Sequence, residues 1–210
     1  MQNTLTERIK ENIHQPYKKI FMNHLPNFFN YKEEGADSGY ETIQDIFLSW
    51  TLRCSEENKE NSEYPNLNEY SRRILLNLIF DDRVPENILI KSVKTKRQWK
   101  LIDLLVEVKT EIDGKTKEYI LNIENKWYTS VRSGQLEKSK EAITKKYSDE
   151  NYNLINLIIM PDFEKLDNNL KNISKRLNYK IKVIEEIKEK TDMVKVTGNY
   201  LFDEYWFKYY

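Results

Sequence analysis

Residues 101–126 read LIDLLVEVKTEIDGKTKEYILNIENK, and this stretch decides the fold. Two apolar runs of strand length flank Asp113-Gly114, a dipeptide that strongly favours a two-residue turn between antiparallel strands. The first run contains Asp103, and the second closes with Glu124-Asn125-Lys126. Charged side chains within hydrophobic strands are costly to desolvate unless they are paired or bound to a cation. These charged positions are therefore candidates for a functional site.

The predicted turn also fixes which residues pair across the two strands. If Asp113 and Gly114 form the loop, the residue numbers of the two partners in each cross-strand pair have the same sum as 113 and 114. One face of the hairpin then becomes wholly apolar, and Asp103 pairs with Glu124, with Cβ atoms roughly 4.5–5.5 Å apart. Strand alternation places Lys126 on the same face. A β-bulge would shift this pairing by one residue.

Two carboxylates at this separation repel each other unless one is protonated or a cation lies between them. Hard oxygen ligands favour Mg²⁺ or Mn²⁺ over zinc. A lysine amine beside the acids lowers their pKa and can orient or help to deprotonate an attacking water. The structural alternative is a salt-bridge cluster in which Lys126 neutralises Glu124 and Asp103 faces solvent. Because this spacing is common by chance, the functional interpretation depends on the strand context, the opposed acids and the helix that follows.

Composition excludes several other kinds of site. The chain has 210 residues and a formal net charge of zero, so it carries no general attraction to nucleic acid or to an anionic membrane. Cys54 is the only cysteine, which excludes an intramolecular disulfide and a cysteine-based zinc site. His14 and His24 lie far in sequence from the acids, so a catalytic triad is poorly supported. No apolar stretch approaches the roughly 20 residues of a membrane span and no signal peptide opens the chain, so we expect no membrane association and a cytoplasmic location.

Hydrophobic periodicity predicts helices followed by alternating strands and helices. The predicted order after the N-terminal helices is β-β-β-α-β-α-β, which indicates an α/β fold with a central mixed β-sheet of about four or five strands flanked by helices. We expect a single domain over residues 1–210, with an N-terminal helical elaboration in 1–84, an α/β core in 86–186 and an aromatic-rich C-terminal segment in 187–210. The predicted helices lie in 4–30 and at 43–50, 70–79, 135–147 and 163–173, and the predicted strands at 88–93, 101–108, 119–123, 154–160 and 181–184.

Two of these segments carry prominent apolar residues. Residues 200–210 contain seven aromatic residues in eleven positions, which either pack on the core as a terminal helix or strand or form a stacking platform for unpaired bases. The helix predicted at 43–50 has an apolar stripe with helical spacing. The stripe consists of Ile43, Ile46, Phe47 and Trp50.

The acids and the lysine together resemble the signature of the PD-(D/E)xK nuclease superfamily. The element order is also similar: a helix carrying an acid, a strand, a strand with Asp, a strand with ExK, a helix and a strand. The text LIDLLVEV…YILNIENKWYTSVRSGQLEKSKEAI resembles a branch with an IDLL…IENK…QL pattern, and the likeness covers roughly residues 40–186. One departure is Trp99-Lys100-Leu101, where related sequences often carry Gly-Arg. The resemblance implies a restriction-endonuclease-like core and a metal-dependent endonuclease that hydrolyses phosphodiester bonds, of DNA in preference to RNA.

The resemblance also implies roles for individual residues. Asp103 and Glu124 would be ligands of Mg²⁺ or Mn²⁺, together with the backbone carbonyl of Asn125. Lys126 would be the catalytic lysine. Gln135 opens the helix after the third strand, where related nucleases hold a glutamine that supports the lysine or the water; it could equally be an ordinary polar residue of a first turn.

The N-terminal acid of the family is matched by Glu41. Asp45, one turn later, competes with it, and Glu107, on the same strand face as Asp103, is a weaker third candidate. The structural alternative for Glu41 is an ordinary acid at a helix N-terminus, where the helix dipole favours negative charge.

Residues 91–100 carry five basic groups and no acid, which suggests a strip that contacts phosphates or, alternatively, a solvated surface. The candidate nucleic-acid contacts are Lys94, Lys96, Arg97 and Lys100. No motif for sequence readout is present in the chain, so a homodimer, a partner protein or the shape of the nucleic acid would supply specificity. The rival interpretations are a catalytically inactive nuclease-fold module that binds nucleic acid or a protein, and a small interaction protein whose motif is accidental.

Overall fold

The predicted hairpin forms the centre of the sheet. In the computed structural model, which describes residues 40–56, 64–126, 134–148, 151–162, 168–192 and 195–209, strand β2 (Ile102–Ile112) pairs antiparallel with β3 (Lys115–Asn125). The register runs unbroken from Leu104 opposite Ile123 to Ile112 opposite Lys115. This is the predicted pairing, and the prediction is confirmed.

The turn has the backbone that its sequence favours. Asp113 has φ 51° and Gly114 has φ 73°. A two-residue turn whose central residues are both left-handed matches the twist of the flanking strands.

A Cβ atom added to Gly114 would meet nothing within 4 Å. We therefore expect Gly114→Ala to destabilise the protein through backbone conformation alone, by about 1 kcal/mol, measured as the free energy of unfolding in urea. A loss much larger than this would mean that the turn makes contacts beyond its own backbone.

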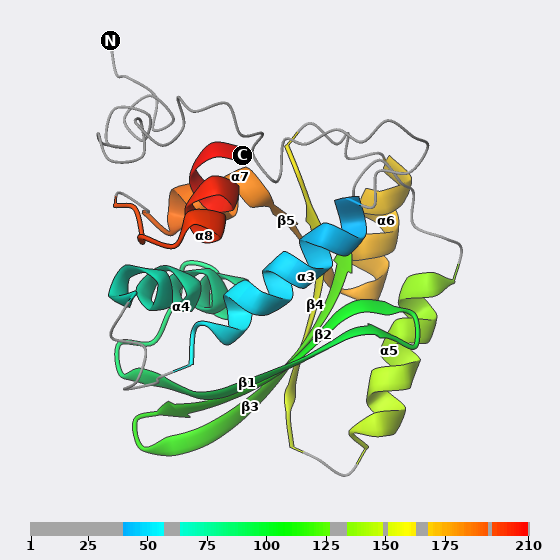
Figure 1. Ribbon diagram of the computed structural model, residues 1–210. Coiled ribbons are helices and arrows are strands. Elements are labelled where there is room, and N and C mark those ends of the chain that lie inside the picture. Colours follow the sequence, from blue (N-terminus) through cyan, green and yellow to red (C-terminus); the bar gives the residue numbers. More distant parts are fainter. Residues whose placement is uncertain are drawn as a thin grey trace, which may run out of the picture.

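The described residues form a five-stranded mixed sheet in the order β1-β2-β3-β4-β5. The strands β1, β2 and β3 are antiparallel neighbours, whereas β3–β4 and β4–β5 are parallel. Helices α3, α4 and α7 cover one face, and α5 and α6 cover the other (Figure 1). The remaining strands are β1 (Ile88–Trp99), β4 (Asn153–Met160) and β5 (Tyr179–Val183). The helices are α3 (Tyr40–Arg53), α4 (Pro65–Phe80), α5 (Gln135–Lys146), α6 (Asn168–Leu177), α7 (Ile184–Lys190), α8 (Tyr200–Glu204) and the π-helical turn η1 (Tyr205–Tyr209).

The α/β class, the mixed sheet and the element order from β1 to β5 are as predicted, but the bounds of several elements differ. Strand β1 continues six residues beyond the predicted end at 93, because it pairs with β2 as far as Trp99 opposite Ile102. The predicted fifth strand begins earlier and ends at Val183, where α7 follows directly. The helices expected in 4–30 and the start of the helix expected at 163 lie outside the described residues.

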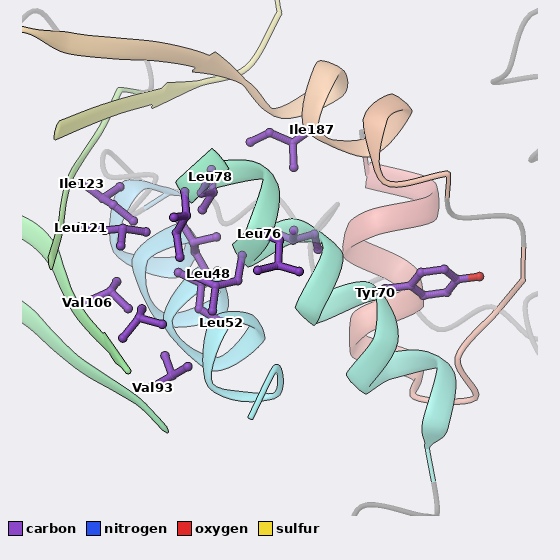
Figure 2. Close-up of a cluster of buried hydrophobic side chains, with 14 of the residues drawn as sticks. Leu48, Leu52, Tyr70, Leu76, Leu78, Val93, Val106, Leu121, Ile123 and Ile187 are labelled. Carbon is purple, nitrogen blue, oxygen red and sulfur yellow. The ribbon is translucent and has the colours of Figure 1, made fainter. Parts of the chain in front are cut away.

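The main hydrophobic core lies between the sheet and helices α3 and α4. Leu52 of α3 and Leu78 of α4 are completely buried against Val106 and Leu121 of the hairpin (Figure 2). These strand residues belong to the apolar face that the register predicts. Ile187 of α7 closes the cluster from the far side of α4.

Most of the predicted apolar stripe of α3 faces the core. Phe47 is buried in the main cluster, and Ile43 and Trp50 pack against it. Ile46 is the exception, because its side chain is 49% exposed, whereas Gln44 and Asp45 are buried. The polar contacts of Gln44 and Asp45, described below, account for their burial.

The C-terminal aromatic residues pack on the core. Phe202 and Trp206 are almost completely buried, and Tyr205 lies with its ring centroid 4.0 Å from that of Phe47. The indole nitrogen of Trp206 lies 3.3 Å from the hydroxyl of Thr51 in α3. The packing interpretation of this segment is confirmed for these residues, and their burial leaves them unavailable for stacking on bases.

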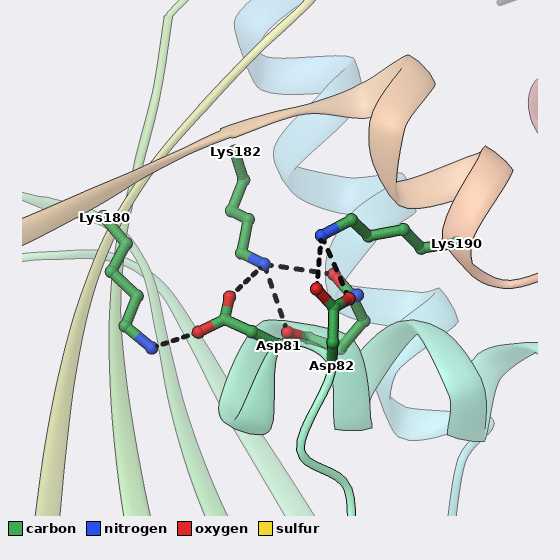
Figure 3. A network of polar contacts seen from close by, with 6 residues as sticks. Asp81, Asp82, Lys180, Lys182 and Lys190 are labelled. Atoms are coloured by element: carbon green, nitrogen blue, oxygen red, sulfur yellow. Dashed lines mark hydrogen bonds and ion pairs between the residues drawn. The ribbon is translucent and has the colours of Figure 1, made fainter.

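A network of lysines and aspartates joins the end of α4 to β5 (Figure 3). Lys182 of β5 is buried and donates to the carboxylate of Asp81 and to the side-chain carbonyl of Asn77. Lys180 pairs with Asp81 at 2.6 Å, and Lys190 of α7 pairs with Asp82 at 3.0 Å. The network connects β5 and α7 to α4 on the face of the sheet opposite α5.

Among the described residues, no helix has the length and apolarity to cross a membrane.

Candidate functional site

Asp103 and Glu124 lie together at the open end of the hairpin, one step beyond the pair Leu104–Ile123. Asp103 is half-buried, and its Oδ2 accepts a hydrogen bond from the backbone nitrogen of Asn125 at 2.9 Å. Glu124 is only 2% exposed and feels the negative charge of Asp103. Both acids lie on the α5 face of the sheet, where the predicted register places them.

Lys126 and Gln135 both contact the carboxylate of Glu124. The amine of Lys126 lies 2.6 Å from Glu124 Oε1, and its backbone nitrogen donates to the carbonyl of Ile159 in β4 at 2.9 Å. Gln135, the first residue of α5, places its side-chain nitrogen 2.7 and 2.8 Å from the two oxygens of Glu124. The structure thus brings together Asp103, Glu124, Lys126 and Gln135, and the ion pair is also the one expected from a structural salt-bridge cluster.

Burial and repulsion shift the ionisation of Glu124. Burial disfavours the charged carboxylate and raises its pKa from 4.5 to about 7, and the like charge of Asp103 acts in the same direction. The amine of Lys126 opposes both effects but does not cancel them. Near neutral pH, Glu124 is therefore partly protonated and partly ionised. A nearby cation would stabilise the ionised form.

This shift predicts a pH dependence of stability. The folded-state pKa of Glu124, about 7, lies above its ordinary value of 4.5, so the folded protein holds a proton that the unfolded chain has released. The resulting stabilisation is complete below the ordinary pKa and is lost as the pH rises through about 7. We expect the free energy of unfolding without divalent metal to fall more steeply from about pH 5 to about pH 8 in the wild type than in Glu124→Gln. Equal slopes in urea titrations would contradict the shift.

On the opposite face of the sheet, Asn125 is held by α3. Its side-chain nitrogen donates to Oδ1 of Asp45, and its side-chain oxygen accepts from Gln44 at 3.3 Å. Asp45 Oδ2 accepts from Gln98 at 3.0 Å. Burial raises the pKa of Asp45 to about 6, and the hydrogen bond from Asn125 opposes the rise, while the charge of Asp103 adds to it. These contacts explain why α3 turns Gln44 and Asp45 towards the sheet.

Of the two candidates for the N-terminal acid whose side chains the structure describes, Asp45 is the one that lies at the site. Glu41 is the second residue of α3, and its side chain lies outside the described residues. Glu107 belongs to a separate cluster with Lys96, Lys146 and the hydroxyl of Tyr147. Burial would raise the pKa of Glu107, but these hydrogen bonds outweigh it and lower the pKa to about 2.

Strand alternation divides the predicted basic strip between the two faces of β1. Lys94 and Lys96 lie opposite Glu107 and Leu105, on the face that carries Asp103. Arg97 lies opposite Leu104 on the α3 face, where its charge reaches Asp45. Lys100 occupies the β1–β2 turn with φ 59°. All four are exposed, but they form no single surface, and Lys96 is already paired with Glu107 at 3.1 Å.

Trp99 packs on the α5 face of the sheet, at the end of β1. Its side chain lies against the small cluster of Ile102, Leu105 and Tyr147 on the α5 face. The amine of Lys146 lies 5.2 Å from the centre of a Trp99 ring, within cation–π distance. Trp99 therefore covers one side of this cluster.

The donor set of the site suits a hard divalent cation with few protein ligands. Within the described parts of the chain, no group of three or more His, Cys, Asp or Glu side chains is placed to hold a metal. Asp103 and Glu124 supply two carboxylates, and magnesium commonly binds through one or two carboxylates while it keeps several waters. Burial raises the pKa of Glu124 most, and the repulsion from Asp103 adds to the rise. A cation between the two carboxylates would offset both effects.

The chain matches no family model, and no curated protein or solved structure is significantly similar to it. Any function must therefore be argued from the geometry of these residues.

Proposed function

We propose that this protein is a metal-dependent nuclease that hydrolyses phosphodiester bonds of nucleic acid, with DNA preferred over RNA, on a restriction-endonuclease-like fold. The observation that carries the proposal is the shared position of Asp103, Glu124 and Lys126 on one face at the end of the β2–β3 hairpin. The topology is compatible with it, since three antiparallel strands are followed by α5 and two parallel strands.

Magnesium or manganese would be held by the carboxylates of Asp103 and Glu124 and by the backbone carbonyl of Asn125. When bound, the ion supplies Lewis-acid polarisation of the scissile phosphate and lowers the pKa of water at the site. The protein holds the two carboxylates close together before the ion binds, and their burial strengthens the interaction with a cation.

The other residues orient the reacting groups. Lys126 is almost fully buried, so its amine has little freedom and can fix an attacking water and offset the charge that grows on the phosphorane. Gln135 donates to both oxygens of Glu124 and so fixes the plane of that carboxylate. Asp45 holds the side chain of Asn125 from the other face and steadies the strand from which Asn125 and Glu124 project.

Nucleic acid would approach the end of the sheet where Lys100 and Arg97 lie close in sequence to Asp103. Phosphate contacts by such residues position the substrate and do not read its sequence. A second copy of the chain or a partner protein would then supply any sequence specificity.

One observation favours a second candidate function, an inactive nuclease-fold module that binds nucleic acid or a protein. Lys126 and Gln135 together already contact both oxygens of Glu124, so the acid is satisfied within the protein. In this case the cluster would be a structural salt bridge, and the fold would serve only for binding.

Incubation with labelled single- and double-stranded DNA and RNA, in magnesium, manganese or chelator, separates the two candidates. The nuclease hypothesis predicts cleavage in either metal, with DNA the better substrate, and none in chelator. Binding without cleavage in every metal would favour the inactive module. If the protein neither binds nor cleaves any of these substrates, both proposed roles in nucleic-acid chemistry are contradicted.

A further inference from the structure

Next to the proposed site, on the same face of the sheet, four polar side chains are buried in an apolar layer. They are Asn122, Ser139, Asn156 and Tyr179. Three of them form a row across adjacent strands, because Asn122 of β3 lies opposite Asn156 of β4, and Asn156 lies opposite Tyr179 of β5. Glu124 is two residues from Asn122 along β3, so it projects from the same face one pleat away.

The four side chains form hydrogen bonds with one another. The side-chain nitrogen of Asn122 lies 2.6 Å from the hydroxyl of Tyr179, 3.0 Å from Asn156 Oδ1 and 3.1 Å from the hydroxyl of Ser139. The hydroxyls of Ser139 and Tyr179 are 2.7 Å apart. A buried polar network of this kind is costly unless every member is paired, and when complete it specifies one arrangement of the elements that it joins.

The network is anchored to the first turn of α5. Ser139 donates to the carbonyl of Leu136 at 2.9 Å, and Tyr179 lies 3.2 Å from the same oxygen. Leu136 directly follows Gln135, the residue that contacts both oxygens of Glu124. The residue before the helix, Gly134, has φ 73°, and no side chain among the described residues caps this end. The position of the first turn therefore depends on its contacts with the sheet.

We propose that Tyr179, Ser139 and Asn122 are positioning residues that fix Gln135, and through it the carboxylate of Glu124, in the proposed active site. This inference rests on the proposed function and assigns a role to residues from β3, β5 and α5. Burial raises the pKa of Tyr179 to about 12, so its hydroxyl remains protonated at neutral pH and available as a donor. The charge of Glu124 contributes to this rise, which is consistent with the short path between the two groups.

The test compares two tyrosine variants that each delete one buried hydroxyl. Tyr179→Phe removes the hydroxyl from the network, whereas Tyr70→Phe removes one that accepts from the backbone nitrogen of Lys195 at 2.9 Å, among the C-terminal residues. The two tyrosines are 6% and 5% exposed, so similar losses of melting temperature are expected. Ser139→Ala is a second substitution that removes a hydroxyl from the network, and alanine has a high helix propensity at this position in α5.

For Tyr179→Phe and Ser139→Ala we expect kcat for nucleic-acid cleavage to fall by about 10–100-fold with KM unchanged, because partners that orient metal-site ligands have effects of this size. Tyr70→Phe should leave both constants at their wild-type values. Equal kcat values in all the variants would overturn the proposal.

A second readout requires no catalysis. The side-chain amide resonances of Gln135, assigned by their absence in Gln135→Ala, should shift in Tyr179→Phe and not in Tyr70→Phe. If the wild-type protein cleaves nothing but these resonances respond, the nuclease function fails while the positioning of Gln135 stands. If the protein cleaves and neither the resonances nor kcat respond, the positioning role fails alone.

Discussion

Replacement of Lys126 by Ala or Met is expected to lower the rate of cleavage by about 10²–10³-fold at saturating nucleic acid, the loss that follows removal of one preorganised electrostatic group. The amine lies 2.6 Å from Glu124 Oε1 and is almost fully buried, so solvent cannot replace it. Lys126→Met retains most of the aliphatic volume. Because the pKa of Glu124 is already about 7, the acid can become neutral by binding a proton, which limits the damage to the fold.

Lys182 provides the matched control. It is also a buried strand lysine with a carboxylate partner, Asp81, but it lies in the network that joins β5 to α4 (Figure 3). Lys182→Met should lose stability through the broken ion pair and leave the rate per folded molecule unchanged. Equal losses of rate in the Lys126 and Lys182 variants would show that Lys126 acts only through stability.

Asp103→Asn is expected to change stability in opposite directions without and with metal. The asparagine retains an oxygen to accept from the backbone nitrogen of Asn125, but it removes the negative charge that adds to the effect of burial on the pKa of Glu124. Without metal, the variant should be more stable than the wild type by on the order of 1 kcal/mol at neutral pH, since one pKa unit corresponds to about 1.4 kcal/mol. With manganese at about 100 times its dissociation constant, the wild type should gain about 2.7 kcal/mol and the variant little or nothing.

Thermal unfolding in chelator and in manganese measures both effects in one experiment. Asp82→Asn is the control, because Asp82 is an exposed acid that pairs with Lys190 of α7 and not with a hairpin residue. An exposed ion pair contributes less than about 1 kcal/mol, so the metal-free stability should change little and the gain from manganese should be that of the wild type. An Asp103→Asn variant that is stabilised by manganese as much as the wild type would contradict a metal site at this position.

The hairpin and its acids could be predicted from the sequence because the information is local. Asp113 and Gly114 favour one turn, and that turn dictates the pairing of every residue in β2 and β3. Strand alternation then determines which side chains share a face. The proximity of Asp103, Glu124 and Lys126 follows from these two rules alone.

The orientation of α3 could be predicted only in part. Phe47 and Trp50 of the predicted stripe pack on the core, yet Ile46 faces solvent. Gln44 and Asp45 face the sheet because they hydrogen-bond with Asn125 and Gln98, which are distant in sequence. Nothing in the local sequence of α3 indicates these partners.

The full length of β1 was missed for a different reason. Beyond Val93, the strand lies at the edge of the sheet, and most of its side chains are polar and exposed. Hydrophobic periodicity is weak in such a strand. The continued pairing with β2 extends it to Trp99 and divides Lys96 from Arg97, which the sequence suggested would form one basic strip.

The positioning network was also beyond local prediction. In the sequence, Asn122 is a polar interruption of a predicted strand, and Tyr179 lies two residues before another. Only the parallel pairing of β3 with β4 and of β4 with β5 brings these two residues together under the first turn of α5.

X-ray diffraction from crystals soaked in Mn²⁺, recorded above and below the manganese absorption edge, tests the central claim most directly. We predict an anomalous peak between the carboxylates of Asp103 and Glu124, with the amine of Lys126 displaced from Glu124. Manganese bound elsewhere in the crystal, with no peak between these acids and Lys126 still paired with Glu124, would contradict the proposed metal site and leave the cluster as a buried salt bridge.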